Sequence, residues 1–142
     1  VKNGISWRQS VYYPLYFASL YGRGESLQLK IKSPKYSSDM FDDVNYIDAS
    51  AVINEEEKTL SFFIINRSEE ENVDLDFDIN NLPIIKIIDQ QIINHTNIYA
   101  SNTISKPNEI VPKITNIASF QNEKLMAKIP KLSYLFILLK IK

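Results

Sequence analysis

The chain has 142 residues, a length that fits one domain with a substantial hydrophobic core. Hydrophobic residues make up 44% and charged residues 23%, which is the composition of a folded globular protein and not of a disordered one. Sixteen basic and 17 acidic residues give a net charge of -1, a balance that offers no electrostatic case for binding nucleic acid or a membrane surface. The absence of cysteine excludes disulfides, thiolate metal sites and cysteine nucleophiles.

The two ends of the sequence carry no membrane or export signal. The start, Val1 to Gly4, leads into polar residues and not into the apolar stretch of a signal peptide. The tail from Leu132 to Ile141 is apolar but has only about half the length that spans a bilayer. We therefore expect a cytoplasmic protein, and the first residue, which is not methionine, hints that the chain is part of a longer one.

One helix is expected near the start, over Val11 to Tyr21. Ser10 is a suitable N-cap, Pro14 falls in the first turn where proline is tolerated, and Gly22 and Gly24 are natural stops. Large apolar groups lie on nearly every side of this helix, a pattern typical of a helix packed between two layers. The remaining residues can cover only one side, so a covering partner for the other side is expected.

After Gly24 the apolar period changes from helical to alternating, which predicts β-strands. A charged turn over Asn54 to Lys58 predicts a hairpin, and the polar stretch from Asn94 to Lys113 predicts a long loop. We expect strands at 27–31, 46–53, 60–65, 73–79, 84–93, 125–129 and 134–141, the last two as a closing pair. Short strands without helices between them predict an all-β fold, an antiparallel β-sandwich with jelly-roll or Greek-key connections.

The acidic residues fit a solvated surface better than a reaction centre. A glycosidase needs two carboxylates facing one bond, and a general acid needs a raised pKa. The acids here fall in turns or on a solvent-facing strand: Glu55 to Glu57, Glu69 to Glu71, Asp74, Asp76 and Asp78. A straight strand does not converge oxygens on a calcium ion, and His95 has no cysteine or second histidine with which to bind zinc. No metal site is predicted.

Aromatic residues concentrate on the expected helix and just before it. Tyr12, Tyr13, Tyr16, Phe17 and Tyr21 have helical spacing, which favours packing over a sugar-stacking platform without excluding the latter. Ahead of them, Trp7-Arg8-Gln9 supplies an indole, a guanidinium and an amide, residue types that line polar pockets.

Several motifs resemble the C-terminal part of glycoside hydrolase family 51 α-L-arabinofuranosidases. The segment from Trp7 to Tyr16, followed by Tyr21-Gly22-Arg23-Gly24, resembles the last barrel helix of that family. The similarity continues in order through Ser33 to Tyr36, Asp43 to Asp48, Ser50 to Val52, Phe63 to Ser68, Asn94-His95, Asn102-Thr103, Lys106-Pro107, Val111-Pro112 and Ile129 to Tyr134.

The resemblance implies a (β/α)₈ barrel followed by a C-terminal jelly-roll sandwich. Such enzymes release terminal α-L-arabinofuranosyl units from arabinan, arabinoxylan and their oligosaccharides with retention, through two glutamates in the barrel. A barrel needs about 250 residues, so it lies outside this chain and no catalytic residue is expected here. Gln9 matches a glutamine that hydrogen-bonds the arabinose, and Trp7 beside it is a second substrate-binding candidate. No cofactor is implied.

The resemblance also implies a division of the chain and a set of partners. Residues 1–24 are expected to be the end of the barrel, and residues 25–142 the non-catalytic sandwich. The expected partners are the barrel in the same chain, an arabinose-containing oligosaccharide and further copies in a homo-oligomer. The family sandwich borrows strand material from the start of the parent chain, so an unpaired sheet edge is expected. An independent carbohydrate-binding module is the alternative function; a freestanding enzyme is a third.

Overall fold

The computed structural model describes residue 4, residues 6–79 and residues 81–142, and these form one helix and eleven strands. The elements are α1 (Tyr12–Tyr21), β1 (Glu25–Leu27), β2 (Lys35–Tyr36), β3 (Val44–Asn45), β4 (Ile47–Asn54), β5 (Thr59–Asn66), β6 (Val73–Phe77), β7 (Ile84–Asn94), β8 (Lys113–Ile114), β9 (Ala118–Gln121), β10 (Lys124–Ile129) and β11 (Ser133–Ile141). All strand pairs are antiparallel, so the expected all-β, antiparallel fold is confirmed.

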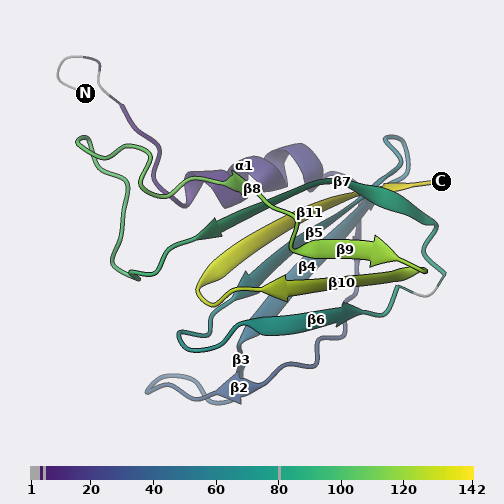
Figure 1. Cartoon of the computed structure of the whole chain (residues 1–142), viewed down its shortest axis with the longest axis horizontal. Helices are drawn as coiled ribbons and strands as arrows, with labels where there is room; N and C mark the ends of the chain where they lie inside the picture. Colours follow the sequence, from purple (N-terminus) through teal and green to yellow (C-terminus); the bar gives the residue numbers. More distant parts are fainter. Residues whose placement is uncertain (1–3, 5, 80) are drawn as a thin grey trace.

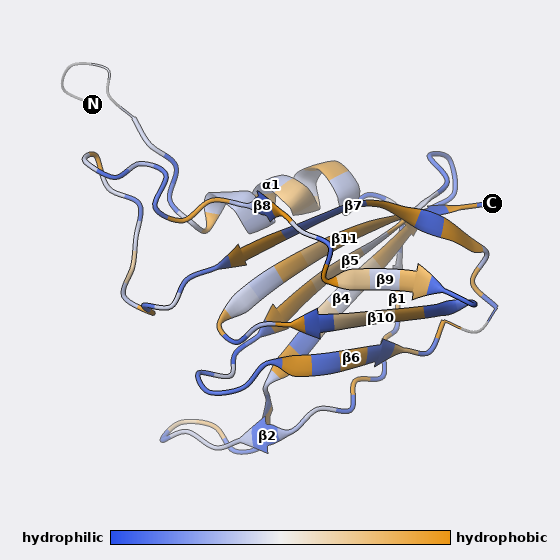
Figure 2. Ribbon diagram, viewed as in Figure 1, coloured by the Kyte–Doolittle hydropathy of each residue, from blue (hydrophilic) through white to orange (hydrophobic). Residues whose placement is uncertain are grey.

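Two sheets face each other, and a short two-stranded ribbon lies beside them (Figure 1). The larger has six strands in the order β1-β4-β5-β11-β7-β8, and the smaller has three in the order β6-β10-β9. Strands β2 and β3 form the separate two-stranded ribbon. The chain passes repeatedly from one sheet to the other, as in a sandwich. Orange, hydrophobic stretches recur along the strands of both sheets in Figure 2. The core between the sheets consists of buried apolar side chains: Ile47, Ala51, Leu60, Phe62, Ile64, Leu125, Ala127, Ile129, Leu135, Ile137 and Leu139.

Strand β11 is buried on both faces and ties the layers together. Its side chains at Leu135, Ile137 and Leu139 enter the core between the sheets. The alternate side chains of Phe136 and Leu138 point to the other face, where α1 lies. A strand covered on both faces reads as a continuous apolar run, which explains the uninterrupted hydrophobicity of this segment.

Helix α1 lies on the outer face of the six-stranded sheet, so the fold has three layers (Figure 1). Gly22 ends the helix and its N–H donates to the carbonyl of Ala18, as expected of a C-cap. The expectation for Ser10 was wrong, because Val11 is the N-cap and no side chain caps the helix. Pro14 stands in the first turn, where its missing N–H breaks no helical bond.

Gly24 allows the chain to turn from the helix into β1 beside β4. Its φ is +133°, and a Cβ at this position would collide with the carbonyl of Ile53. Only glycine tolerates both the backbone angle and the close approach.

Three strand expectations were wrong in detail. The hydrogen-bonded ladder of β1 ends at Leu27, although Leu29 and Ile31 continue to pack against the core from an unpaired extended segment. Strands β10 and β11 do not pair with each other: β10 lies between β6 and β9, and β11 between β5 and β7. The short strands β2, β3, β8 and β9 were not anticipated. The hairpin of β4 and β5 and the long polar connection after β7 are confirmed.

Candidate functional site

The segment before α1 is hydrogen-bonded to Asn102, a residue of the long loop between β7 and β8. The indole N–H of Trp7 donates to the backbone carbonyl of Asn102 at 3.0 Å. The side-chain amide of Gln9 donates to the same carbonyl at 3.2 Å. The two residues singled out in the sequence therefore share one acceptor, more than ninety positions away in the chain.

Asn102 is buried beneath this contact, with 1% of its surface exposed. Its Nδ2 donates to the carbonyls of Arg8 and Ile110, each at 2.8 Å, and its Oδ1 accepts the N–H of Ile110 at 2.7 Å. Both N–H donors of the amide are used, so the side chain is fully engaged. The same residue closes the loop from 102 to 110 and fixes the backbone of the segment that bears Trp7 and Gln9.

Charged groups at the outer end of this loop add further connections. The Nε2 of His95 lies 3.5 Å from a carboxylate oxygen of Glu109, and the Nζ of Lys106 lies 3.6 Å from the other. The Nδ1 of His95 accepts the N–H of Asn97 at 3.0 Å. The histidine therefore stands directly after β7 as part of a local loop network.

The aromatic residues of α1 divide into two groups with different surroundings. Phe17 and Tyr21 stack on Phe136 of the sheet, with ring centroids 4.7 and 5.0 Å apart. On the other side, Tyr12 and Tyr16 stack on each other and are 38% and 44% exposed. The guanidinium of Arg8 lies 5.0 Å from the centroid of the Tyr12 ring. One half of the cluster packs the helix onto the sandwich, and the other half forms an exposed row that begins at the candidate segment.

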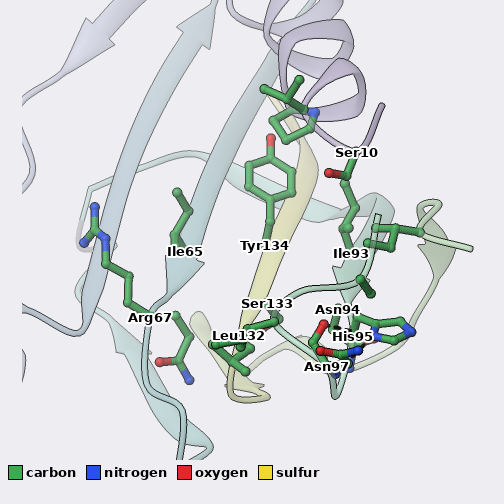
Figure 3. Close-up of a pocket in the computed structure, with 16 residues that line it drawn as sticks. Ser10, Ile65, Arg67, Ile93, Asn94, His95, Asn97, Leu132, Ser133 and Tyr134 are labelled. Carbon is green, nitrogen blue, oxygen red and sulfur yellow. Dashed lines mark hydrogen bonds between the residues drawn. The ribbon is translucent and has the colours of Figure 1, made fainter. Parts of the chain in front are cut away.

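Two hollows border this region. The smaller, of about 310 Å³, lies between the segment before α1 and the loop, and is lined by Ser6, Trp7, Arg8, Tyr13, Pro107 and Asn108. The larger, of about 550 Å³, is an open groove at the start of α1 (Figure 3), with Ile65, Ile93 and Tyr134 among its lining residues. Neither hollow is lined by an aspartate or a glutamate among the described residues.

Tyr134 lines the larger hollow and carries a hydroxyl group that lacks a hydrogen-bond partner among the described residues. This hydroxyl is buried. Burial raises the pKa of this phenol above its ordinary value, because the phenolate would lose its hydration. The hydroxyl points along the sheet towards the helix (Figure 3).

The acidic residues lie where the sequence indicated. Sixteen of the 17 aspartates and glutamates are exposed, and Asp89 is half-buried and accepts a hydrogen bond from Gln91 at 2.8 Å. Asp74, on the outer side of β6, lies 3.7 Å from Lys128. No group of three or more potential metal-binding side chains occurs among the residues that the structure describes.

The sequence singled out Trp7 and Gln9 as site candidates, and it did not single out Asn102, whose carbonyl both of them bond. Tyr12 and Tyr16 lie in the predicted helix. The sequence alone did not show that they are exposed whereas Phe17 packs against the sheet. In the part of the chain that the structure covers, no helix has the length and apolar character needed to cross a membrane.

Comparison with known proteins identifies the chain. The family model for the α-L-arabinofuranosidase C-terminal domain matches residues 1–133. The chain belongs to this family. The domain is 37% identical over 139 residues to the intracellular exo-α-(1→5)-L-arabinofuranosidase 1 of Bacillus subtilis, covering 98% of this chain and 27% of that protein. It is 33% identical over 133 residues to the intracellular exo-α-(1→5)-L-arabinofuranosidase of Halalkalibacterium halodurans, covering 94% of this chain and 26% of that protein.

Solved structures agree with the sequence matches. The family 51 α-L-arabinofuranosidase of Bifidobacterium longum superposes with a TM-score of 0.87 at 26% identity, covering 96% of this chain and 26% of that one. The resemblance of the sequence to the C-terminal domain of family 51 α-L-arabinofuranosidases is therefore confirmed. The domain spans about a quarter of the length of the relatives that it matches.

Proposed function

We propose that this domain completes an α-L-arabinofuranosidase whose catalytic carboxylates are supplied by a barrel domain in the same chain. The whole protein would hydrolyse terminal α-L-arabinofuranosyl residues of arabinan, arabinoxylan and arabino-oligosaccharides with retention. Retention requires two carboxyl groups about 5 to 5.5 Å apart on either side of one bond. The acids of this domain lie at its surface and line neither hollow, which supports a non-catalytic role.

The outer face of α1 is the observation that carries this proposal. Val11 and Leu15 are 63% and 65% exposed, whereas Phe17 on the opposite side is 4% exposed. A helix that is apolar all round is normally covered on both sides, because exposed apolar surface of this kind marks a contact face. We propose that the barrel covers this side and that residues 1–24 form the junction, with residues 25–142 as the sandwich.

Gln9 and Trp7 are the proposed points of contact with the sugar. Both lie on the segment that enters α1, and therefore at the edge of the surface assigned to the barrel. An amide and an indole suit a furanosyl unit, because the amide hydrogen-bonds hydroxyls and the ring packs against carbon atoms. The relatives named above are called intracellular, and we propose a cytoplasmic location for this protein too.

One substitution measured in two settings tests the proposed docking face. Leu15→Glu places a charge on the outer side of α1. In the full-length enzyme the charge would be buried at the domain contact and should cost about 2 kcal/mol or more of stability. In the 142-residue chain alone, the same side chain stays in water, and the change should be within about 0.5 kcal/mol.

Met126→Glu is the matched control, because Met126 is 48% exposed on the remote three-stranded sheet. It should have a small effect in both settings. Urea unfolding of the six proteins, wild type and two variants in each setting, gives the comparison. Equal effects of Leu15→Glu in both settings would show that this face meets no other domain.

A further inference from the structure

We propose that Asn102 is a positioning residue for the arabinofuranosyl site, because it sets the side-chain orientation of Gln9. This inference rests on the proposed function, in which Gln9 contacts the sugar. Asn102 itself is 1% exposed, so its side chain does not reach a ligand. Its effect would pass entirely through the segment that it holds.

Asn102 fixes the backbone of the segment before α1. The Nδ2 of Asn102 donates to the carbonyl of Arg8, the residue between Trp7 and Gln9, at 2.8 Å. The other bonds of the same amide, to the carbonyl and N–H of Ile110, close the loop from 102 to 110 and hold Asn102 within it. The conformation of the segment before α1 is therefore determined by a buried group on another element.

Asn102 also fixes the orientation of the Gln9 amide. A backbone carbonyl only accepts hydrogen bonds, so the atom of Gln9 that faces Asn102 at 3.2 Å must be the nitrogen. The alternative, with the amide turned over, would set two oxygens against each other. The contact therefore leaves the Oε1 of Gln9, together with one N–H, available to a ligand.

The side of the Gln9 amide that accepts hydrogen bonds is therefore fixed relative to the sugar site. The Oε1 of Gln9 is presented as an acceptor for a furanose hydroxyl. The indole of Trp7, which donates to the same carbonyl at 3.0 Å, is fixed beside it. A hydrogen-bonding group held in advance costs less conformational entropy on binding than a free side chain, and a displacement of about 1 Å can cost about 100-fold in rate.

Gln9→Glu removes the N–H that holds the side chain to the carbonyl of Asn102. A carboxylate still offers acceptor oxygens to a ligand, but it cannot donate to that carbonyl and is repelled by it. Gln9 is at the surface, so the variant is expected to fold. In the full-length enzyme, with an aryl α-L-arabinofuranoside as substrate, kcat/KM should fall about as far as in Gln9→Ala, on the order of 10- to 100-fold. Retention of wild-type kcat/KM by Gln9→Glu would overturn the inference.

Asn102→Ala tests the positioning residue directly, and Asn66→Ala is its control. Asn66 is also 1% exposed and also bonds backbone groups, the carbonyls of Glu71, Ile129 and Pro130, but it does not touch the segment before α1. Both variants lose stability, but only Asn102→Ala should lower kcat/KM, on the order of 10-fold or more. In a Gln9→Ala background Asn102→Ala should have little further effect, because both act through one group.

A second readout needs no activity. Trp7 is the single tryptophan of the 142-residue chain, so its fluorescence reports the indole environment alone. Asn102→Ala should raise the acrylamide quenching constant of Trp7, and Asn66→Ala should leave it unchanged. If Gln9→Ala lowers kcat/KM but Asn102→Ala affects neither readout, the positioning role is wrong and the proposed function stands. If Gln9→Ala itself has no effect, the sugar contact is wrong and the positioning role is overturned with it.

Discussion

Phe17 of α1 stacks face to face on Phe136 of β11, with ring centroids 4.7 Å apart and ring planes 9° apart. Both side chains are buried, at 4% and 0% exposure. The contact joins the start of the chain to the central strand near its end. It makes the helix an integral layer of the fold and leaves the opposite side of the helix free.

Phe17→Ala should therefore loosen the whole helix from the sandwich. Removing a buried aromatic ring typically costs about 3 to 5 kcal/mol of unfolding free energy, through lost burial and the cavity left behind. Urea unfolding of the 142-residue chain, followed by circular dichroism, measures the loss. Leu15→Ala is the control on the exposed side and should change stability by less than about 1 kcal/mol. Similar losses for the two variants would show that α1 is not seated through Phe17.

Tyr134→Phe should leave the chain as stable as wild type or stabilise it by about 1 kcal/mol near neutral pH. The phenol hydroxyl is buried and has no hydrogen-bond partner among the residues that the structure describes. Its removal therefore breaks none of the described hydrogen bonds and removes an uncompensated desolvation of the hydroxyl. A clear loss of stability in thermal or urea unfolding would mean that the hydroxyl does have a stabilising partner.

The same tyrosine predicts a pH dependence at alkaline pH. Burial raises the pKa of Tyr134 in the folded chain above the ordinary value of 10.0. Above pH 10.0 the unfolded state loses this proton while the folded state keeps it, so the contribution present below that pH is progressively lost. The unfolding free energy of the wild type should thus fall more steeply with pH than that of Tyr134→Phe. Parallel curves from pH 9 to about pH 11 would contradict the assigned burial.

Glu123→Gly should stabilise the hairpin of β9 and β10. Asn122 and Glu123 form its two-residue turn with φ values of +50° and +60°, angles that favour Asn-Gly. Glycine at the second position should add about 0.5 to 1 kcal/mol, measured as a shift in the urea midpoint. Glu56→Gly, in the turn after β4, is the control without a positive φ and should be neutral or slightly destabilising. A destabilising Glu123→Gly would show that the glutamate side chain contributes more than the backbone angle costs.

Strands with a regular burial pattern were predictable from the sequence, and strands without one were not. Val73, Leu75 and Phe77 alternate with aspartates, and Leu125, Ala127 and Ile129 alternate with longer polar or flexible side chains, so β6 and β10 could be recognised. Strands β2, β3 and β8 have two residues each, too few to show any period. At Leu29 and Ile31 the side chains alternate as expected, but no neighbouring strand supplies a ladder.

The candidate site was only partly predictable, for a similar reason. Trp7 and Gln9 stood out by residue type and by resemblance. Asn102 lies in a polar loop rich in asparagine, where most such residues are exposed. Its side chain bonds Ile110 of the same loop and Arg8, which is 94 positions away in the chain. A buried asparagine differs from an exposed one only through its neighbours, which a single sequence does not reveal.

The most direct test of the central claim compares hydrolysis by two proteins. Initial rates of release from an aryl α-L-arabinofuranoside would be measured for the full-length enzyme and for the 142-residue chain alone at equal concentrations. The account predicts turnover by the full-length enzyme and none above background by the chain, because it assigns the catalytic carboxylates to the barrel. Turnover by the chain alone at a comparable rate would contradict it.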